Sequence, residues 1–179
     1  MTPMTDAQLA QRIGATSILR GEFTLRSGRK SSFYVDKYLF ETEPDILAEI
    51  ARRMAGRIDA QTTRIAGAEL GGVAIAAATS LASGLPFLIV RNARKDYGTG
   101  RRFEGKLASG DRILLVEDIA TTGGQVLEAA ALLTDAGAKV QRIVAVVDRG
   151  QGARENITMA GFVFESLLSA QDLNLPAES

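Results

Sequence analysis

Cysteine and histidine are both absent from this chain of 179 residues. Without cysteine, the chain has no disulfides and no thiolate zinc sites. Without histidine, it has no Ser-His-Asp or Cys-His catalytic arrangement and no imidazole ligand for a metal. These absences argue against a hydrolase of the usual kind, and they favour chemistry that depends on positioning and electrostatics.

An excess of one charge and long apolar runs are missing as well. Lysine plus arginine and aspartate plus glutamate number 21 each, so no global field attracts nucleic acid and we expect no nucleic-acid partner. No apolar run approaches the length of a membrane span, and the polar residues 1–11 lack a signal-peptide core. We therefore expect a cytoplasmic protein without membrane contact, folded as one domain over residues 1–179.

Hydrophobic periodicity predicts alternating strands and helices over most of the chain. Helices are expected at residues 5–19, 44–58, 73–82 and 126–136. Strands are expected at residues 64–68, 86–90, 113–116, 140–147 and 162–167, and shorter ones at 23–25 and 32–35 around a turn at 27–29. Because the longer strands are almost wholly apolar, the pattern indicates an α/β fold whose parallel sheet has helices on both faces.

The strongest functional signal is the stretch Ile-Leu-Leu-Val-Glu-Asp-Ile-Ala-Thr-Thr-Gly-Gly-Gln at residues 113–125. Its glycines and hydroxyls precede a helix, and the N–H groups at a helix N-terminus favour an anion such as phosphate. Its two carboxylates would repel phosphate but can accept hydrogen bonds from sugar hydroxyls. The stretch therefore predicts a ribose 5-phosphate site, formed by Glu117, Asp118, Ile119, Ala120, Thr121, Thr122, Gly123, Gly124 and Gln125. The alternative is an ordinary strand–turn–helix with a glycine-rich cap.

A second signal is the segment 91–107, which lacks apolar periodicity and is rich in arginine and lysine. Long loops inside compact domains are usually functional. We interpret this one as a mobile cationic lid that closes over a polyanion and excludes water. The alternative is a solvated charged hairpin. Two further loops, at 69–72 and 148–150, are expected at the same carboxyl edge of the sheet, where ligands bind in such folds.

With these motifs the chain resembles the orotate phosphoribosyltransferases, which are type I phosphoribosyltransferases, from Phe23 to about Leu168. The matching elements are Phe-Thr-Leu-Arg-Ser-Gly-Arg at 23–29, Ala-Gly-Ala-Glu-Leu-Gly-Gly-Val at 66–73, the lid, residues 117–125, and Val-Asp-Arg-Gly at 147–150. The resemblance implies a type I phosphoribosyltransferase-like parallel sheet flanked by helices. It also implies a small N-terminal hood over the active site, formed by about residues 1–40.

The resemblance also implies roles for single residues. The catalytic residues would be Lys95 and Asp118. Phosphoribosyl pyrophosphate (PRPP) would be bound by residues 117–125 and by the lid residues Arg91, Asn92, Lys95 and Tyr97. The pyrophosphate loop would contain Leu70, Gly71 and Gly72, and orotate would contact Thr121, Arg149 and Arg26.

Four places depart from the common pattern of this family. Arg26 and Asn92 stand where lysine is usual, and Tyr97 stands where some members have histidine. One branch has an aromatic residue and a lysine where this chain has Leu70 and Gly71. We expect fewer side-chain contacts from the pyrophosphate loop for this reason.

The implied reaction joins orotate to PRPP, giving orotidine 5′-monophosphate and pyrophosphate in the de novo synthesis of UMP. Mg²⁺ carried by PRPP or pyrophosphate is the implied cofactor, and no residue is assigned as a metal ligand. The family's lid reaches the partner subunit's active site, which implies a homodimer. Two alternatives remain: a phosphoribosyltransferase for another base, and a non-catalytic regulator with this fold.

Overall fold

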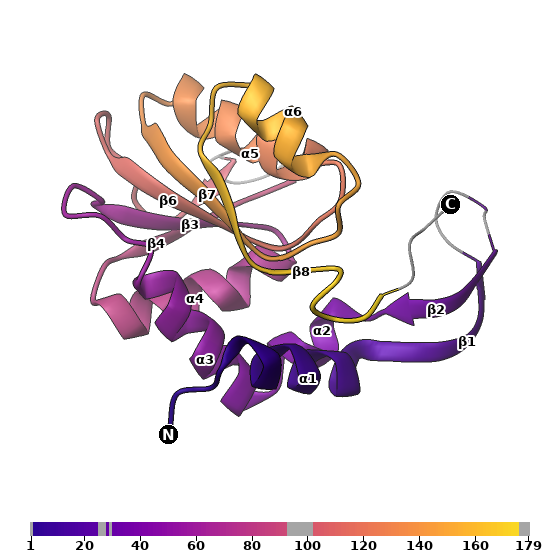
Figure 1. Cartoon of the computed structure of the whole chain (residues 1–179). Coiled ribbons are helices and arrows are strands. Elements are labelled where there is room, and N and C mark those ends of the chain that lie inside the picture. Colours follow the sequence, from indigo (N-terminus) through magenta and orange to yellow (C-terminus); the bar gives the residue numbers. More distant parts are fainter. Residues whose placement is uncertain (1, 25–27, 29, 93–101, 176–179) are drawn as a thin grey trace.

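The computed structural model describes residues 2–24, 28, 30–92 and 102–175 (Figure 1). The helices are α1 Asp6–Ser17, α2 Lys37–Glu41, α3 Pro44–Ala55, α4 Gly71–Ser83, α5 Gly124–Asp135 and α6 Ala153–Met159. The strands are β1 Ile18–Thr24, β2 Lys30–Val35, β3 Arg64–Ala68, β4 Phe87–Val90, β5 Phe103–Glu104, β6 Arg112–Ala120, β7 Lys139–Asp148 and β8 Phe164–Ser169.

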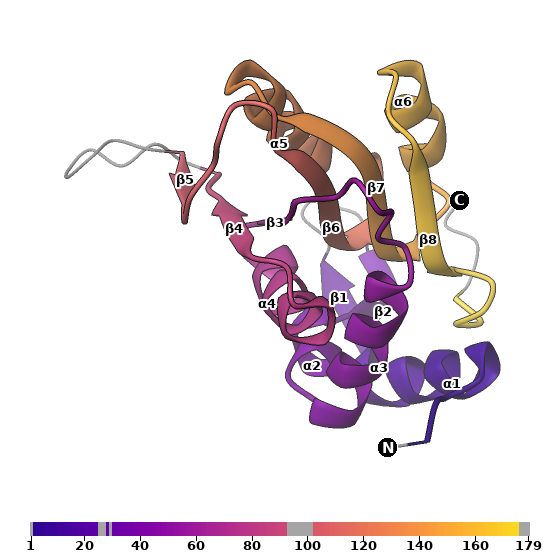
Figure 2. The same cartoon turned by 90° about the vertical axis from the view of Figure 1, so that its left-hand side faces the viewer.

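The central sheet has six strands in the order β5-β4-β3-β6-β7-β8. All neighbours in it are parallel except β4 and β5, which are antiparallel. Helices α1 to α4 lie on one side of the sheet, and α5 and α6 lie on the other (Figures 1 and 2). This arrangement confirms the predicted α/β fold with a mainly parallel sheet flanked by helices.

Strand order reverses between β3 and β6. From β3 the chain continues outward to β4, whereas from β6 it continues the other way to β7 and β8. Such a switch point opens a crevice at the carboxyl ends of the two strands, which is the usual ligand position in open α/β sheets. The loops at 69–72 and 121–123 leave the sheet there, so the topology brings two of the predicted motifs together.

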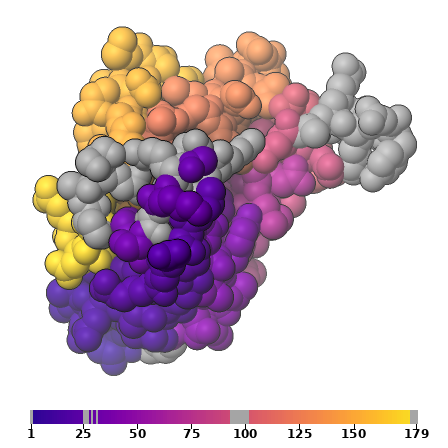
Figure 3. All heavy atoms as spheres, turned by 90° about the vertical axis from the view of Figure 1, so that its right-hand side faces the viewer, coloured from indigo at the N-terminus to yellow at the C-terminus, as the bar shows by residue number. Residues whose placement is uncertain are grey.

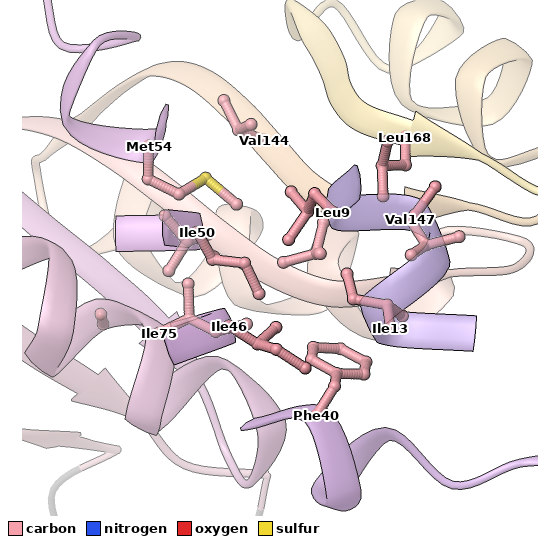
Figure 4. Packing of buried hydrophobic residues seen from close by; sticks show 14 of the residues in the cluster. Leu9, Ile13, Phe40, Ile46, Ile50, Met54, Ile75, Val144, Val147 and Leu168 are labelled. Atoms are coloured by element: carbon pink, nitrogen blue, oxygen red, sulfur yellow. The ribbon is translucent and has the colours of Figure 1, made fainter. Parts of the chain in front are cut away.

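Two apolar clusters, one on each side of the sheet, form the core. Figure 4 shows the cluster between the sheet and the N-terminal helices, where Leu9 and Ile13 meet Phe40, Ile50 and Met54. Side chains in β6 alternate between the two sides, as they must in a strand. Leu114 and Val116 belong to this first cluster, while their neighbours Ile113 and Leu115 belong to the second, under α5 and α6.

The N-terminal part forms a separate helical and hairpin layer beside the sheet. A capping box between Thr5 and Gln8 begins α1, and a bidentate ion pair from Arg12 to Asp45 ties α1 to α3. Strands β1 and β2 form an antiparallel hairpin that extends away from the central sheet (Figure 1). Among the described parts of the chain, no helix has the length and apolar character needed to cross a bilayer.

Several element boundaries differ from those predicted. The first helix ends at Ser17, so the expectation of helix through Leu19 is wrong, because Leu19 pairs with Tyr34 in the hairpin. Strand β6 does not stop at Val116 but runs on to Ala120, because β7 offers pairing partners along that whole length. Helices α2 and α6 and strand β5 were not predicted, and β5 lies within a segment expected to be a loop.

Candidate active site

The turn between β6 and α5 forms a small polar cavity at the switch point. Gly123 adopts a left-handed conformation with φ of 80° and is the N-cap of α5, so the first N–H groups of the helix face the turn. The cavity measures about 200 Å³ and is bordered by Glu117 and by residues 119–126. Asn156 of α6 donates a hydrogen bond of 2.9 Å to the carbonyl of Thr122, which holds the turn from outside. The geometry suits a phosphate group.

Both predicted carboxylates lie inside β6 rather than in the turn. Glu117 is 6% exposed and Asp118 is 1% exposed. Burial raises the pKa of Glu117 well above its ordinary value, and the neighbouring Asp118 raises it further. Glu117 borders the cavity of the phosphate turn, whereas Asp118 is not among the residues that border it. The two carboxylates therefore adjoin the predicted phosphate position but differ in their surroundings.

A lysine that the sequence did not single out pairs with Asp118. Lys37, the first residue of α2, places its Nζ 2.6 Å from Asp118 Oδ2. Burial lowers the pKa of Lys37, but the attraction of Asp118 outweighs this and the net pKa is raised. Glu41, one turn further along α2, is 4% exposed, and its carboxyl group also interacts with Asp118. Burial and the Asp118 charge raise the pKa of Glu41 to about 8.

Close backbone approach explains the glycines in and before the β3–α4 loop. A Cβ on Gly67 would lie 2.1 Å from the Gly72 carbonyl oxygen, so the end of β3 touches the start of α4. A Cβ on Gly71 would lie 1.4 Å from Asp118 Oδ2. Leu70 between strand and helix is 60% exposed, and the Glu69–Leu70 peptide bond is cis. The predicted pyrophosphate loop therefore lies directly against the Asp118 carboxylate.

Hydrogen bonds join three of the predicted loops. The Asn92 side-chain amide donates to the Glu69 carbonyl at 2.8 Å, and the Gln125 side-chain amide donates to the same carbonyl at 2.8 Å. Gln125 also donates to Asn92 Oδ1 at 3.2 Å. Asn92, which stands where a lysine is usual, thus connects the base of the lid to the pyrophosphate loop and to α5. The predicted convergence of these loops is confirmed.

The base of the predicted lid is a short hairpin. Val90 pairs with Phe103, and the Arg91 N–H donates to the Arg102 carbonyl at 2.9 Å. Arg91 also approaches Glu104, with Nη1 3.5 Å from Oε1. A regular stem therefore stands where an unstructured loop was expected. Three predicted site residues lie outside the described residues: Lys95, Tyr97 and Arg26.

The end of β7 supplies a second and larger cavity. The Arg149 N–H donates to the Ala120 carbonyl at 2.9 Å, which ties the predicted orotate residue to the end of β6. The cavity measures about 480 Å³, and its border includes Asp148, Arg149, Gly150 and Arg154. Figure 3 shows this side of the molecule, with the N-terminal hairpin and helices below and the layer of α5 and α6 above. Thr121 lies on the exposed turn that leads from β6, so it belongs to the neighbouring cavity of the phosphate turn.

Comparison with known proteins agrees with this geometry. The Phosphoribosyl transferase domain family matches residues 40–175. The orotate phosphoribosyltransferase of Halobacterium salinarum is 47% identical over 94% of this chain and 96% of its own length. Two structures of Mycobacterium tuberculosis orotate phosphoribosyltransferase cover 95% of this chain and 99% of their own. One, in complex with Fe(III) dicitrate, has a TM-score of 0.86 at 35% identity, and the other, in complex with PRPP, has 0.80 at 32%. The chain therefore belongs to the phosphoribosyl transferase domain family, and within it to the orotate phosphoribosyltransferases.

Proposed function

We propose that this chain transfers ribose 5-phosphate from PRPP to orotate, giving orotidine 5′-monophosphate and pyrophosphate for UMP synthesis. The observation that carries the proposal is the β6–α5 turn. It joins a helix N-terminus suited to phosphate with two buried carboxylates, at the switch point of a parallel sheet. The relatives named orotate phosphoribosyltransferase support orotate as the acceptor.

In the proposed reaction, the bond from C1′ to the pyrophosphate oxygen breaks and a bond from C1′ to orotate N1 forms. The leaving pyrophosphate keeps the electron pair of the broken bond, and the proton of orotate N1 passes to solvent water. Positive charge grows on the ribose in the transition state, where Glu117 and Asp118 accept hydrogen bonds from the ribose hydroxyls. Residues 121–125 hold the 5′-phosphate. C1′ can therefore move from the pyrophosphate oxygen towards orotate N1 while the groups at both ends stay bound.

Stabilising the leaving pyrophosphate is the main electrostatic task. We assign it to Lys95, Arg91 and Arg26, with backbone N–H groups of Gly71 and Gly72 at the start of α4. Asn92 and Tyr97 complete the PRPP contacts of the lid, and Leu70 lies in the pyrophosphate loop. Lys95 is the proposed catalytic cation, because it carries a full charge in the centre of the lid sequence.

Mg²⁺ is the proposed cofactor, bound to the oxygens of PRPP and pyrophosphate, which are its preferred ligands. Among the described residues, no group of three or more ligating side chains is arranged around a metal position. We therefore assign no residue of the chain as a metal ligand. When bound, Mg²⁺ supplies positive charge to the pyrophosphate oxygens.

Orotate is proposed to lie against Arg149 and Thr121, with Arg26 approaching from the hood. Arginine suits orotate, since its planar fork can bind a carboxylate edge or stack on a flat ring. The hydrogen bond of 2.9 Å from the Arg149 backbone N–H to the Ala120 carbonyl keeps this residue beside the proposed ribose site. The proposed orotate position is thus adjacent to the proposed position of C1′.

We further propose a cytoplasmic homodimer in which each lid closes over the active site of the partner subunit. Residues 1–40 would form a hood on a single catalytic domain. The exposed apolar side chains Leu39 on α2 and Leu70 in the β3–α4 loop support such an interface.

A steady-state assay with PRPP and each of orotate, uracil, adenine and guanine tests the proposed function. We expect pyrophosphate release to depend on orotate. Faster release with another base would support a phosphoribosyltransferase of different specificity. Release with none of the bases, despite tight PRPP binding, would support a regulator that keeps the fold.

A further inference from the structure

Two side chains of α2 surround the carboxylate of Asp118. Lys37 and Glu41 stand four residues apart and so occupy the same face of this short helix. Lys37 Nζ is 2.6 Å from Asp118 Oδ2, and Glu41 Oε1 lies 3.0 Å from the point where a Gly71 Cβ would be. Asp118 is almost wholly buried beneath them.

Hydrogen bonding in this cluster requires protons. Three side-chain oxygens of this cluster are buried and have no geometrically defined hydrogen bond: Glu41 Oε1, Glu117 Oε2 and Asp118 Oδ2. Lys37 forms a close ion pair with Asp118 Oδ2. A proton on Glu41 and another on Glu117 would supply donors, leaving Asp118 as the one ionised carboxylate opposite Lys37.

Among the described residues, the charged groups that shift the pKa of Glu41 come from α2, from β6 and from the residue before α2. They are Lys37 on α2, Asp118 on β6, and Asp36 before α2. Lys37 is the cation that lowers the pKa of both Glu41 and Glu117, whereas Asp118 raises both. The charged residues of α3 that are described pair elsewhere, as Glu49 does with Arg52 and Arg53. Lys37 is therefore the group that balances the negative charge of the site.

We propose that Lys37 and Glu41 are positioning residues that hold the Asp118 carboxylate in the space left open by Gly71. Lys37 balances its charge, and Glu41 donates a hydrogen bond to it. This inference rests on the proposed function, because it gives Asp118 a role at the ribose. Helix α2 thereby has a part in aligning the sugar site. The sequence of α2, Lys-Tyr-Leu-Phe-Glu, does not reveal this part.

A double-mutant cycle on Lys37 and Asp118 tests whether Lys37 acts through Asp118. Lys37→Met keeps most of the side-chain length but removes the charge. We expect kcat to fall about tenfold or more, since a 1 Å misplacement at an active site can cost about 100-fold. Lys37→Arg should recover part of the loss. The control is Lys139→Met, an exposed lysine at the start of β7, which should leave kcat unchanged.

The kcat of the double variant Lys37→Met/Asp118→Asn shows whether Lys37 has a positioning role. If Lys37 acts only through Asp118, this variant has the same kcat as Asp118→Asn alone. A further tenfold loss would overturn the proposal, because Lys37 would then contact the substrate directly. This comparison also works if Lys37→Met alone does not fold, since the double variant no longer contains an Asp118 carboxylate buried without its lysine.

The pH profile separates a positioning role from a merely structural one. Without Lys37, Glu41 and Glu117 should keep their protons to higher pH, so the alkaline limb of kcat/KM for PRPP should move up by about one unit. Glu41→Gln keeps a donor for Asp118, so its kcat at pH 7 should match the wild type, and the fall of kcat above about pH 8 should be weaker. An unshifted alkaline limb in a folded Lys37→Met variant, or a tenfold loss in Glu41→Gln at pH 7, would overturn the inference.

Failure of the inference differs from failure of the proposed function. If Asp118→Asn retains the wild-type kcat, the proposed ribose role of Asp118 is wrong. If Asp118→Asn loses activity while Lys37→Met keeps it, only the positioning role is wrong.

Discussion

Asp118 Oδ2 fills the place that a side chain on Gly71 would occupy, because an ideal Cβ on Gly71 would lie 1.4 Å from that oxygen. The catalytic carboxylate proposed here and the pyrophosphate loop therefore depend on each other sterically. A lysine at position 71, as in one branch of the family, is incompatible with this placement of Asp118. In this chain Lys37 brings a lysine ammonium to the same carboxylate from α2.

Gly71→Ala should displace Asp118 and lower kcat by about tenfold or more, because the carboxylate is short and held in a strand. Gly71 has no left-handed φ, so alanine is compatible with its backbone. The matched control is Gly14→Ala in α1, where the added Cβ meets only Ile18 Cδ1 at 3.5 Å. That variant should keep full activity and gain up to about 1 kcal/mol of stability. Equal activity in the two variants would contradict the steric relationship.

Arg149→Ala should raise the KM for orotate far more than the KM for PRPP. Losing one partner of a buried charge pair typically costs about 2–5 kcal/mol. The preference for orotate over uracil should narrow as well, because uracil lacks the carboxylate. Arg149→Lys should recover part of the orotate affinity, since an ammonium cannot reproduce the planar fork. Equal weakening of both substrates would instead indicate that Arg149 serves the fold or the pyrophosphate.

Glu41→Gln should stabilise the protein at alkaline pH. Because the pKa of Glu41 is raised from 4.5 to about 8, the folded state binds more protons than the unfolded state between those values. The free energy of unfolding of the wild type should therefore fall as the pH rises through this window. The Glu41→Gln variant should lack the part of this fall that comes from Glu41. Urea denaturation at pH 5, 7 and 9 measures the difference, with the exposed Glu128→Gln on α5 as the control. A stability difference that does not grow between pH 5 and pH 9 would contradict the proton on Glu41.

Mixed dimers should restore activity if each lid acts across the interface. Lys95→Ala and Asp118→Asn should each lower kcat by about tenfold or more on their own. In a mixed dimer both lesions fall in one active site, and the other site is intact. Subunit exchange between the two variants should then recover activity. Each mixed dimer should have about half the activity of a wild-type dimer, because one of its two sites is intact. No recovery, with exchange confirmed by mass spectrometry of tagged subunits, would indicate a lid that acts in its own subunit or a monomer.

Much of the fold follows from local sequence pattern. The apolar strand Arg64–Ala68 matches its prediction, and α3 buries Ile46, Ile50 and Met54 on the face that periodicity indicates. Glycines and hydroxyls marked the turn that precedes α5, because phosphate sites require backbone freedom and donors in short succession. These signals are local, so they can be read from one sequence.

The parts that escaped prediction depend on tertiary contacts. Helix α2 has only five residues, too few for a helical period to stand out, and its Glu41 looks like an ordinary surface charge. Burial of Glu41 arises because α1, α3 and α4 surround α2, and nothing in the neighbouring residues indicates this. The extension of β6 through Glu117 and Asp118 likewise depends on pairing with β7. Charged residues within a strand become visible only when the partner strand is known.

The central claim is that residues 117–125 form the ribose 5-phosphate site of an orotate phosphoribosyltransferase. The most direct measurement is kcat for orotate and PRPP in the variant Asp118→Asn, with folding verified by circular dichroism and thermal denaturation. We predict a folded protein whose kcat is lower by about tenfold or more, because a carboxylate that stabilises charge on the ribose is lost. A folded Asp118→Asn variant with the wild-type kcat would contradict the claim.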